Sequence, residues 1–362
     1  MENENGQGTG RNRAALENDF EVYFQGKTTL DNGITVGVLY QLENPTTGTT
    51  QARKDEMMVY LSGGFGTVEV GDRDPMTRRM GLRAPSASSF NADDGSFGFS
   101  NGGQNAGGAR YQDTLYAPGG TVTTAQALAN DRTKVIYLTP RIAGFQLGVS
   151  YAPDGNNEHH ADGSSFQNKA GISDEISVGV NYSATFGGIR VNAMGAFATA
   201  DEANAAVPAC ATTVAGTGCV RSNKDPFLWN IGANVGFGPV TVGGSYANLN
   251  KFGAADIRAS IWSLGATYNL APVTIGLSGI VGNSNVPFTG GTAAAPAASA
   301  VSNTLNNTTT QTFDTWRLVL DAAYALGPGI NLQGGLIYTY QNDLTRNDYD
   351  SLALATGIRV AF

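Results

Sequence analysis

The chain has 362 residues, 48 of them glycine, with a formal net charge of −8 and a sequence pI near 4.8. This acidic balance argues against a nucleic-acid-binding protein, whose binding face is basic. Charged residues make up 14% of the chain, well below the ~25% of soluble globular proteins, yet the mean hydropathy is only −0.16. No run approaches the ~18 apolar residues of a membrane-spanning helix. Such a composition is typical of an all-β protein that hides its hydrophobicity in alternating strands.

The first residues are acidic and polar, at positions where a signal peptide would carry a basic and then an apolar stretch. We therefore expect a mature or trimmed form, or a wrongly assigned start. Residues 1–19, with Gly6, Gly8 and Gly10, predict a polar external loop. Residues 20–362 then form one domain, because the strand pattern runs through them without a break.

Apolar and polar side chains alternate in segments of about ten residues, as membrane-spanning strands require. A charged side chain that faces lipid costs roughly 2–4 kcal/mol at the bilayer midplane, so charged residues indicate which side of a strand faces the lumen. Charged residues of several strands occupy the alternate positions that face inward: Lys27, Glu69, Arg190, Arg317 and Asp321. Only in the segment 132–140 does the pattern not decide which set of alternate residues faces the lipid. The fifteen predicted strands cover residues 20–30, 34–43, 53–63, 66–73, 132–140, 144–152, 174–185, 188–199, 226–237, 239–250, 259–270, 272–283, 314–326, 330–341 and 350–362.

Short turns and long polar loops alternate along the chain. Turn sequences such as Asp31-Asn32-Gly33 and Phe186-Gly187-Gly188 favour tight hairpins on one rim, and the long loops lie on the other. Bacterial single-chain barrels have an even number of strands. The pattern therefore predicts a transmembrane antiparallel β-barrel of the 16-stranded type whose first strand is missing, leaving 15 visible strands.

The residues resemble the general diffusion porins of Gram-negative bacteria, especially the alphaproteobacterial type. The resemblance rests on Leu30-Asp31-Asn32-Gly33-Ile34, on Tyr60-Leu61-Ser62-Gly63-Gly64-Phe65-Gly66, on Thr139-Pro140-Arg141-Ile142-Ala143-Gly144-Phe145, and on the terminal Phe362, which is similar to the assembly signal of outer-membrane barrels. It implies a water-filled homotrimer in the bacterial outer membrane, surrounded by lipid and lipopolysaccharide, through which small hydrophilic solutes and ions diffuse passively.

The resemblance also implies where the pore is narrowest. Residues 74–131 contain no clear strand, and loops of that length are usually functional or disordered. In the family the third external loop folds into the lumen, so its acidic side chains face a basic wall. The candidates are Asp93, Asp94 and Asp113 on the loop, opposite Lys27, Lys54, Arg73 and Arg190 on the wall. The alternative for each is a solvated charge, and Arg78, Arg79, Arg83 and Arg110 could join either side.

The two cysteines, Cys210 and Cys219, lie close together in one predicted external loop, and an oxidising compartment favours a disulfide over free thiols. His159 and His160 share a polar loop, so solvation is favoured over metal binding there. A Ser-His catalytic pair needs its histidine on a rigid element beside the nucleophile. We therefore expect neither an enzyme nor a cofactor.

The function predicted from the sequence is passive diffusion through a pore with a weak preference for cations, because Asp and Glu outnumber Lys and Arg, 30 to 22. Two alternatives stay open at this point. A substrate-specific channel would line its path with aromatic or basic steps, for which inward Tyr23 and Tyr60 give faint support. An adhesin or structural barrel would carry no solute flux.

Overall fold

The chain is nearly all-β in the computed structural model, which describes residues 2–4, 20–43, 53–93, 124–125, 127–154, 171–203, 225–252, 257–289, 308–342 and 349–361. All strands belong to one antiparallel sheet, in the order β1, β16 and then down to β2, so that β2 to β16 pair with their neighbours in sequence. The strands are β1 (Glu2–Glu4), β2 (Glu21–Thr29), β3 (Thr35–Glu43), β4 (Arg53–Gly63), β5 (Gly66–Arg73), β6 (Arg132–Leu138), β7 (Phe145–Asp154), β8 (Gly171–Phe186), β9 (Ile189–Ala203), β10 (Phe227–Phe237), β11 (Val240–Phe252), β12 (Ile257–Asn269), β13 (Val273–Thr289), β14 (Thr308–Gly327), β15 (Ile330–Asn342) and β16 (Tyr349–Val360).

The fifteen predicted strands are confirmed as β2 to β16. The predicted and observed strand ends differ most at β13 and β14, which extend as far as Thr289 and Thr308 in one long hairpin. Tight turns join them on one rim. At the β8–β9 turn both Gly187 and Gly188 have positive φ, and Phe186 pairs with Ile189, as in the two-residue turns that match strand twist.

The expected external loop over residues 1–19 needs one correction, because Glu2–Glu4 form strand β1. Glu4 pairs with Ser351 and Glu2 with Ala353, at the loop-side end of β16. Three residues are far short of the ~9–11 that span a membrane. Among the described residues, β1 and β2 are the two ends of the sheet order.

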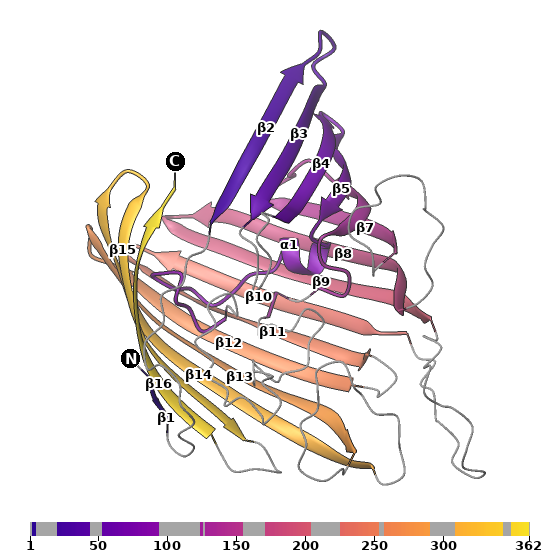
Figure 1. The fold of residues 1–362 in the computed structure, drawn as a ribbon. Coiled ribbons are helices and arrows are strands. Elements are labelled where there is room, and N and C mark those ends of the chain that lie inside the picture. The colour runs from indigo at the N-terminus through magenta and orange to yellow at the C-terminus, as the bar shows by residue number, and fades with distance from the viewer. Residues whose placement is uncertain are drawn as a thin grey trace, which may run out of the picture.

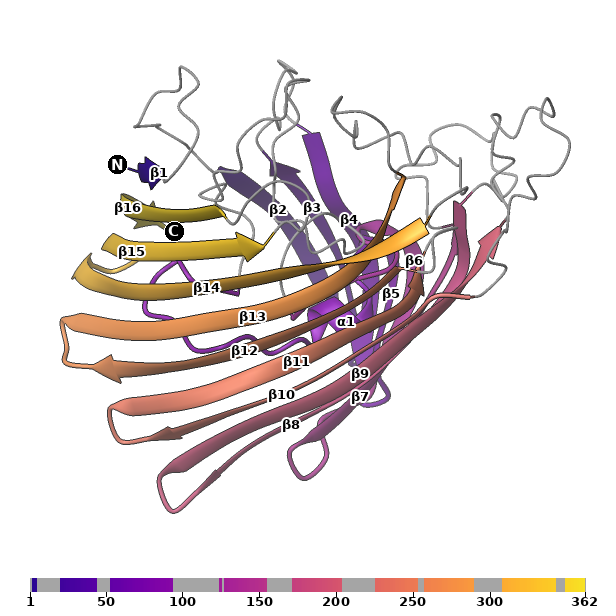
Figure 2. The ribbon, with the colours of Figure 1, turned by 90° about the horizontal axis from the view of Figure 1, so that it is seen from below.

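The sheet is strongly curved. Figures 1 and 2 show β8 to β16 side by side in a curved layer, with β2 to β5 rising from one end and the short helix α1 (Met76–Arg79) on the concave side. No helix among the described residues has the length and apolarity to cross a membrane.

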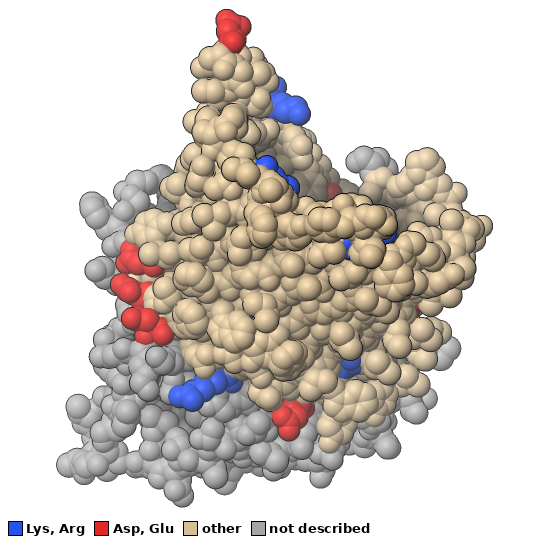
Figure 3. Space-filling view, turned by 180° about the vertical axis from the view of Figure 1, so that it is seen from behind, with Lys and Arg blue, Asp and Glu red and all other residues tan. Residues whose placement is uncertain are grey.

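The convex face is apolar, as the alternation predicted. Leu264 and Trp262 are 73% and 61% exposed there, whereas inward Glu69 and Asp321 are buried. In Figure 3 this face is largely free of charged atoms, which gather toward its margins. The open parity of β6 is resolved too: Val135 and Tyr137 point outward, and Ile136 is buried on the inner side. Such a surface fits the hydrocarbon core of a membrane.

The buried core of the described chain lies inside the curve, between the wall and the segment that follows β5. Each of its three clusters joins wall residues to that segment: Phe90 and Ala92 pack on β12 to β16, Met76 and Met80 on β6 and β9, and Leu128 on β8 to β12. The core therefore fixes a loop against the inner wall.

Candidate functional site

The loop segment begins at Asp74 and turns at once toward the concave side of the sheet. Pro75 caps α1 in an extended conformation, and the helix contacts β7 to β10 (Figure 2). Its residue Met76 is fully buried, and Met80 nearly so. Flexible methionine side chains fill irregular gaps well, so a short helix can sit closely on the pleated wall.

Glycines on the lumen side of the wall mark the route of the loop. An ideal Cβ atom at Gly265 would lie 2.6 Å from the Pro85 carbonyl oxygen, and one at Gly276 would lie 2.7 Å from the backbone nitrogen of Ala87. Both distances are too short for a real Cβ. The loop backbone therefore occupies the space that larger side chains would fill. The glycines in contact with residues 76–90 form what we call the glycine track: Gly148, Gly179, Gly232, Gly265, Gly276, Gly335 and Gly357.

Polar side chains of the wall hold the loop backbone by hydrogen bonds. Asn230 donates to the carbonyl oxygens of Thr77 and Thr124, at 2.6 and 3.0 Å. The Asp321 carboxylate accepts from the Ser86 hydroxyl at 2.8 Å and from the Ser88 backbone N–H at 2.5 Å. Further bonds run from Asn234 to the Arg83 carbonyl, from the Ser89 N–H to Gln333 and from the Ala92 N–H to Ser278. The Thr77 N–H also donates to the Ser177 hydroxyl on β8, at 3.1 Å, so the loop is attached from β8 to β15.

Asp93 closes this attached stretch. Its carboxylate is fully buried and accepts hydrogen bonds from the backbone N–H of Thr124, at 2.6 Å, and from the Thr124 hydroxyl. Thr124 also contacts the Ser245 hydroxyl, which bonds to Ser263 at 2.6 Å. Burial raises the pKa of Asp93, and the bonds from Thr124 oppose that rise. This placement puts Asp93 against the wall and away from the open lumen.

A network of ion pairs surrounds the point where the loop leaves β5. Lys54 pairs with Asp72, and Arg73 pairs with Glu56. Arg79 forms a bidentate ion pair with Glu69, and Arg78 pairs with Asp74 at 3.2 Å. Arg78 also donates to Asn130, near the other end of the loop. The network therefore links both ends of the loop to the wall strands β4 and β5.

Carboxyl groups crowd on one side of this network. Oxygens of Glu56, Asp74 and Asp131 lie within 4.8 Å of one another. Burial, and then the neighbouring charges of Asp74 and Asp55, raise the pKa of Asp131 to about 8. Three carboxyl groups at such spacing could ligate a hard cation, but Glu56 and Asp74 already have arginine partners. Ion pairing and protonation account for the cluster.

The predicted site residues occupy three different environments. Lys54 and Arg73 belong to the ion-pair network, and Asp93 is buried against the wall. Lys27 on β2 and Arg190 on β9 are exposed, opposite Gly37 and Gly236 in register. Asp94, Asp113, Cys210 and Cys219 lie outside the described residues.

Sequence reasoning missed the residues that hold the loop. The alternation of apolar and polar residues identifies neither the glycines of the track nor Asn230 as contacts of the loop. One signal was available: an inward position of a wide barrel has room for a side chain, so repeated inward glycines indicate that something else fills the space.

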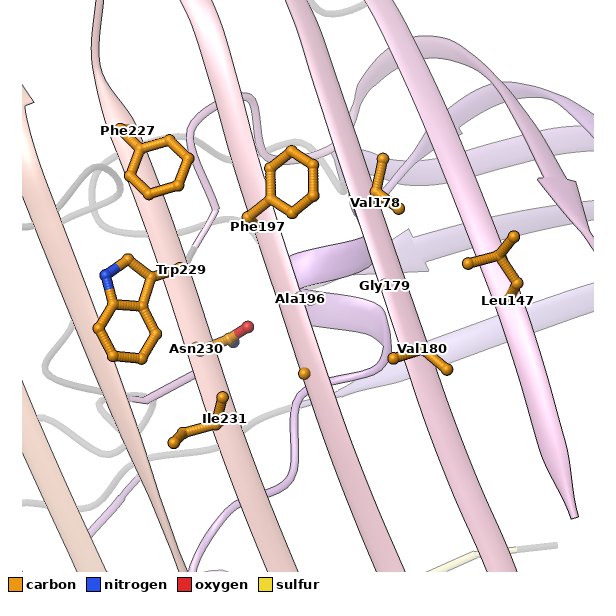
Figure 4. Close-up of a pocket in the computed structure, with 11 residues that line it drawn as sticks. Leu147, Val178, Gly179, Val180, Ala196, Phe197, Phe227, Trp229, Asn230 and Ile231 are labelled. Atoms are coloured by element: carbon orange, nitrogen blue, oxygen red, sulfur yellow. The ribbon is translucent and has the colours of Figure 1, made fainter.

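The convex face carries a shallow apolar cavity of about 340 Å³. Figure 4 shows Leu147, Val178, Val180 and Phe197 on one side of it and Phe227, Trp229 and Ile231 on the other. These side chains have outward parity, and most are well exposed. The cavity is therefore part of the membrane-facing surface and not of the lumen.

An apolar convex face, polar and charged side chains on the concave side, and a loop laid across the inside are the features of a channel-forming protein of the outer membrane. The family model described as "Gram-negative porin" matches residues 1–344, so the chain belongs to the Gram-negative porin family. It is an outer-membrane channel for the passive diffusion of small hydrophilic solutes and ions through a water-filled pore. No curated protein sequence matches the chain significantly.

Solved porin structures share the fold at low sequence identity. The chain is similar to an anion-selective porin from Comamonas acidovorans, with 17% identity, a TM-score of 0.57 and coverage of 94% of this chain and 89% of that one. It is also similar to a loop-deletion mutant of OmpT, an outer membrane protein of Vibrio cholerae, with 12% identity, a TM-score of 0.55 and coverage of 94% and 89%. A third similar structure is the outer membrane channel DcaP of Acinetobacter baumannii, with 10% identity, a TM-score of 0.55 and coverage of 94% of this chain and 84% of that one.

Proposed function

We propose that this porin is a general diffusion channel whose lumen is narrowed by residues 74–131. The observation that carries the proposal is the attachment of residues 76–93 to the inner wall by the glycine track and by hydrogen bonds, which Asn230 donates and which Asp321 and Gln333 accept. A loop held at so many points keeps a constant shape. Solutes would then be selected by size and charge and not by a moving gate.

The charge pattern gives this filter its expected selectivity. Lys27 and Arg190 supply positive charge to the wall, and Asp94 and Asp113 supply negative charge to the loop. Opposed charges across a narrow opening orient water and dipolar solutes. With a formal net charge of −8, we expect a weak preference for cations that fades at high salt, because the Debye length falls to ~3 Å at 1 M.

The remaining parts of the proposal concern assembly. We propose a homotrimer, embedded in outer-membrane lipid and lipopolysaccharide, with residues 20–362 as the barrel domain and most of residues 1–19 outside the membrane. We also propose that the loop cysteines Cys210 and Cys219 form a disulfide and that the protein has no enzymatic activity. Chemical cross-linking in outer-membrane vesicles should yield a species of three copies, and a purely monomeric pattern would contradict the trimer.

Single-channel recording in planar bilayers tests the proposed function. We expect large stepwise openings in KCl that depend little on the solute, together with passage of neutral sugars up to a size limit in liposome swelling. Silent bilayers from well-folded protein would refute the diffusion channel. An anion preference at low salt would refute only the charge assignment.

A further inference from the structure

A second cavity lies on the lumen side, between the attached loop and the short-turn rim. Its volume is about 320 Å³, and it is lined by the rim-side ends of β13 to β16 and by Ala87 of the loop. Because the Ser86 hydroxyl and the Ser88 N–H are bonded to Asp321, Ala87 is held over this space. The cavity is therefore bounded by the attached loop on one side and by the short-turn rim on the other.

The sheet register brings four polar side chains to this cavity. Arg359 on β16 is directly opposite Asn331 on β15, and Ala323 on β14 is opposite both Gln333 on β15 and Thr274 on β13. Directly opposed residues on one face have Cβ atoms about 4.5–5.5 Å apart. The small side chains of Ala323 and Ala325 leave the floor open between the polar groups.

The chemistry of these groups is rich in hydrogen-bond donors. The Arg359 guanidinium is exposed and has no ion-pair partner among the described residues. The Gln333 carbonyl oxygen accepts from the Ser89 N–H at 3.3 Å, which leaves its amide nitrogen to donate elsewhere. No acidic side chain is found among the described residues that line the cavity. A lone guanidinium with amide and hydroxyl neighbours matches an oxyanion, and its planar fork suits a carboxylate in particular.

We propose that this cavity is a binding subsite for small hydroxylated carboxylates. Arg359 binds the carboxylate by paired N–H donors, and Asn331, Gln333 and Thr274 bind hydroxyl groups of the same solute. The volume is at the lower end of small-molecule sites, which suits a solute the size of a sugar acid. The subsite rests on the proposed diffusion function, since solutes reach it by passing the constriction.

The subsite has a consequence for transport. A weak site just beyond the narrowest point holds a solute that has already passed the constriction. Return through the constriction is then less frequent than release on the short-turn side. Such a carboxylate preference is local and coexists with the overall cation preference, because it comes from one unpaired guanidinium and not from the net charge.

Current-fluctuation analysis of single channels tests the subsite, with gluconate as the probe and sorbitol as the neutral control. In the wild type, gluconate should give saturable current fluctuations and sorbitol should not. Arg359→Gln should raise the half-saturating gluconate concentration about ten-fold or more, since hydrogen bonds to a charged group are worth at least one factor of ten. Arg359→Lys should show a smaller loss, because it keeps the charge but not the fork.

Arg141→Gln is the matched control. It removes one exposed positive charge from the same short-turn rim, in the turn between β6 and β7 and away from the cavity, and should leave gluconate binding unchanged. Equal effects of Arg359→Gln and Arg141→Gln, or equal responses to gluconate and sorbitol, would overturn the subsite. KCl conductance of each variant separates the two proposals: a wild type that conducts KCl without a gluconate response fails only the subsite, and one that does not conduct fails the diffusion channel.

Discussion

The glycine track predicts a specific defect when side chains are added to the wall. In the double variant Gly265→Ala and Gly276→Ala, the new Cβ atoms would lie 2.6 Å from the Pro85 oxygen and 2.7 Å from the Ala87 nitrogen, and ordinary contact begins near 3.4 Å. Both neighbours are backbone atoms, so no rotamer change relieves the overlap. The loop must move away from the wall and into the lumen. We expect lower single-channel conductance and a loss of stability of about 1–3 kcal/mol, as for other overpacked sites.

The matched control is Gly195→Ala on β9. An ideal Cβ there meets only the Ile231 side chain, at 3.7 Å, so the variant should match the wild type in conductance and in thermal unfolding in detergent. Single-channel recordings at fixed salt measure the pore, and circular dichroism measures the unfolding midpoint. If the double variant conducts and unfolds like Gly195→Ala, the loop does not lie against these strands and our account of the constriction is wrong.

Three further predictions follow from the site. Asn230→Leu leaves two buried carbonyl oxygens without their donor and should lower stability by about 1–3 kcal/mol; an unchanged unfolding midpoint would contradict this. Because the pKa of Asp131 is about 8, the carboxyl group is neutral below that pH and anionic above it. The cation preference of the channel should therefore be stronger at pH 9 than at pH 7. Reversal potentials of Asp131→Asn should show no such difference between the two pH values. Replacing Lys27 and Arg190 by Gln should increase cation preference at 0.1 M salt but little at 1 M, and a shift equally large at both salt concentrations would argue against a lumen charge effect.

The raised pKa of Asp131 also affects stability. The unfolded carboxyl ionises near pH 4, whereas the folded group keeps its proton until about pH 8. The stability that the protonated group maintains is therefore fully present below pH ~4 and is lost as pH rises toward 8. Unfolding midpoints should fall less with rising pH in Asp131→Asn than in the wild type, and parallel curves would exclude this role.

The sequence predicted the wall well because one side of every strand faces hydrocarbon. A single misplaced charge would be costly there, so Trp262 and Leu264 on one parity and Arg317 and Asp321 on the other identify the register without any tertiary information. The parity of β6 stayed open for a clear reason. Its inner residue Ile136 is apolar because Met76 and Met80 of the loop cover it, and alternation cannot separate an apolar residue facing lipid from one facing a loop.

The inner surface was harder to predict for the same reason. A lumen residue can face water, a neighbouring strand or the loop, and each environment accepts different side chains. Asp93 looked like a pore-lining charge, but the hydroxyl and N–H of Thr124 satisfy its carboxylate inside the packed core. Its partner is 31 residues away in the sequence, beyond the reach of any local pattern.

Both surfaces of the wall depend on the same two-residue period, but they use it in opposite ways. Outward positions are filled with large apolar side chains, so Gly195 only makes a shallow depression there. Inward positions that the loop crosses are often glycine, and polar side chains between these glycines, such as Asn230 and Asp321, form hydrogen bonds with the loop backbone. The constriction is thus specified by where the wall lacks side chains as much as by the residues of the loop. Between Ala87 and the short-turn rim the loop does not fill the space, and the wall residues Asn331 and Arg359 are left facing a polar cavity.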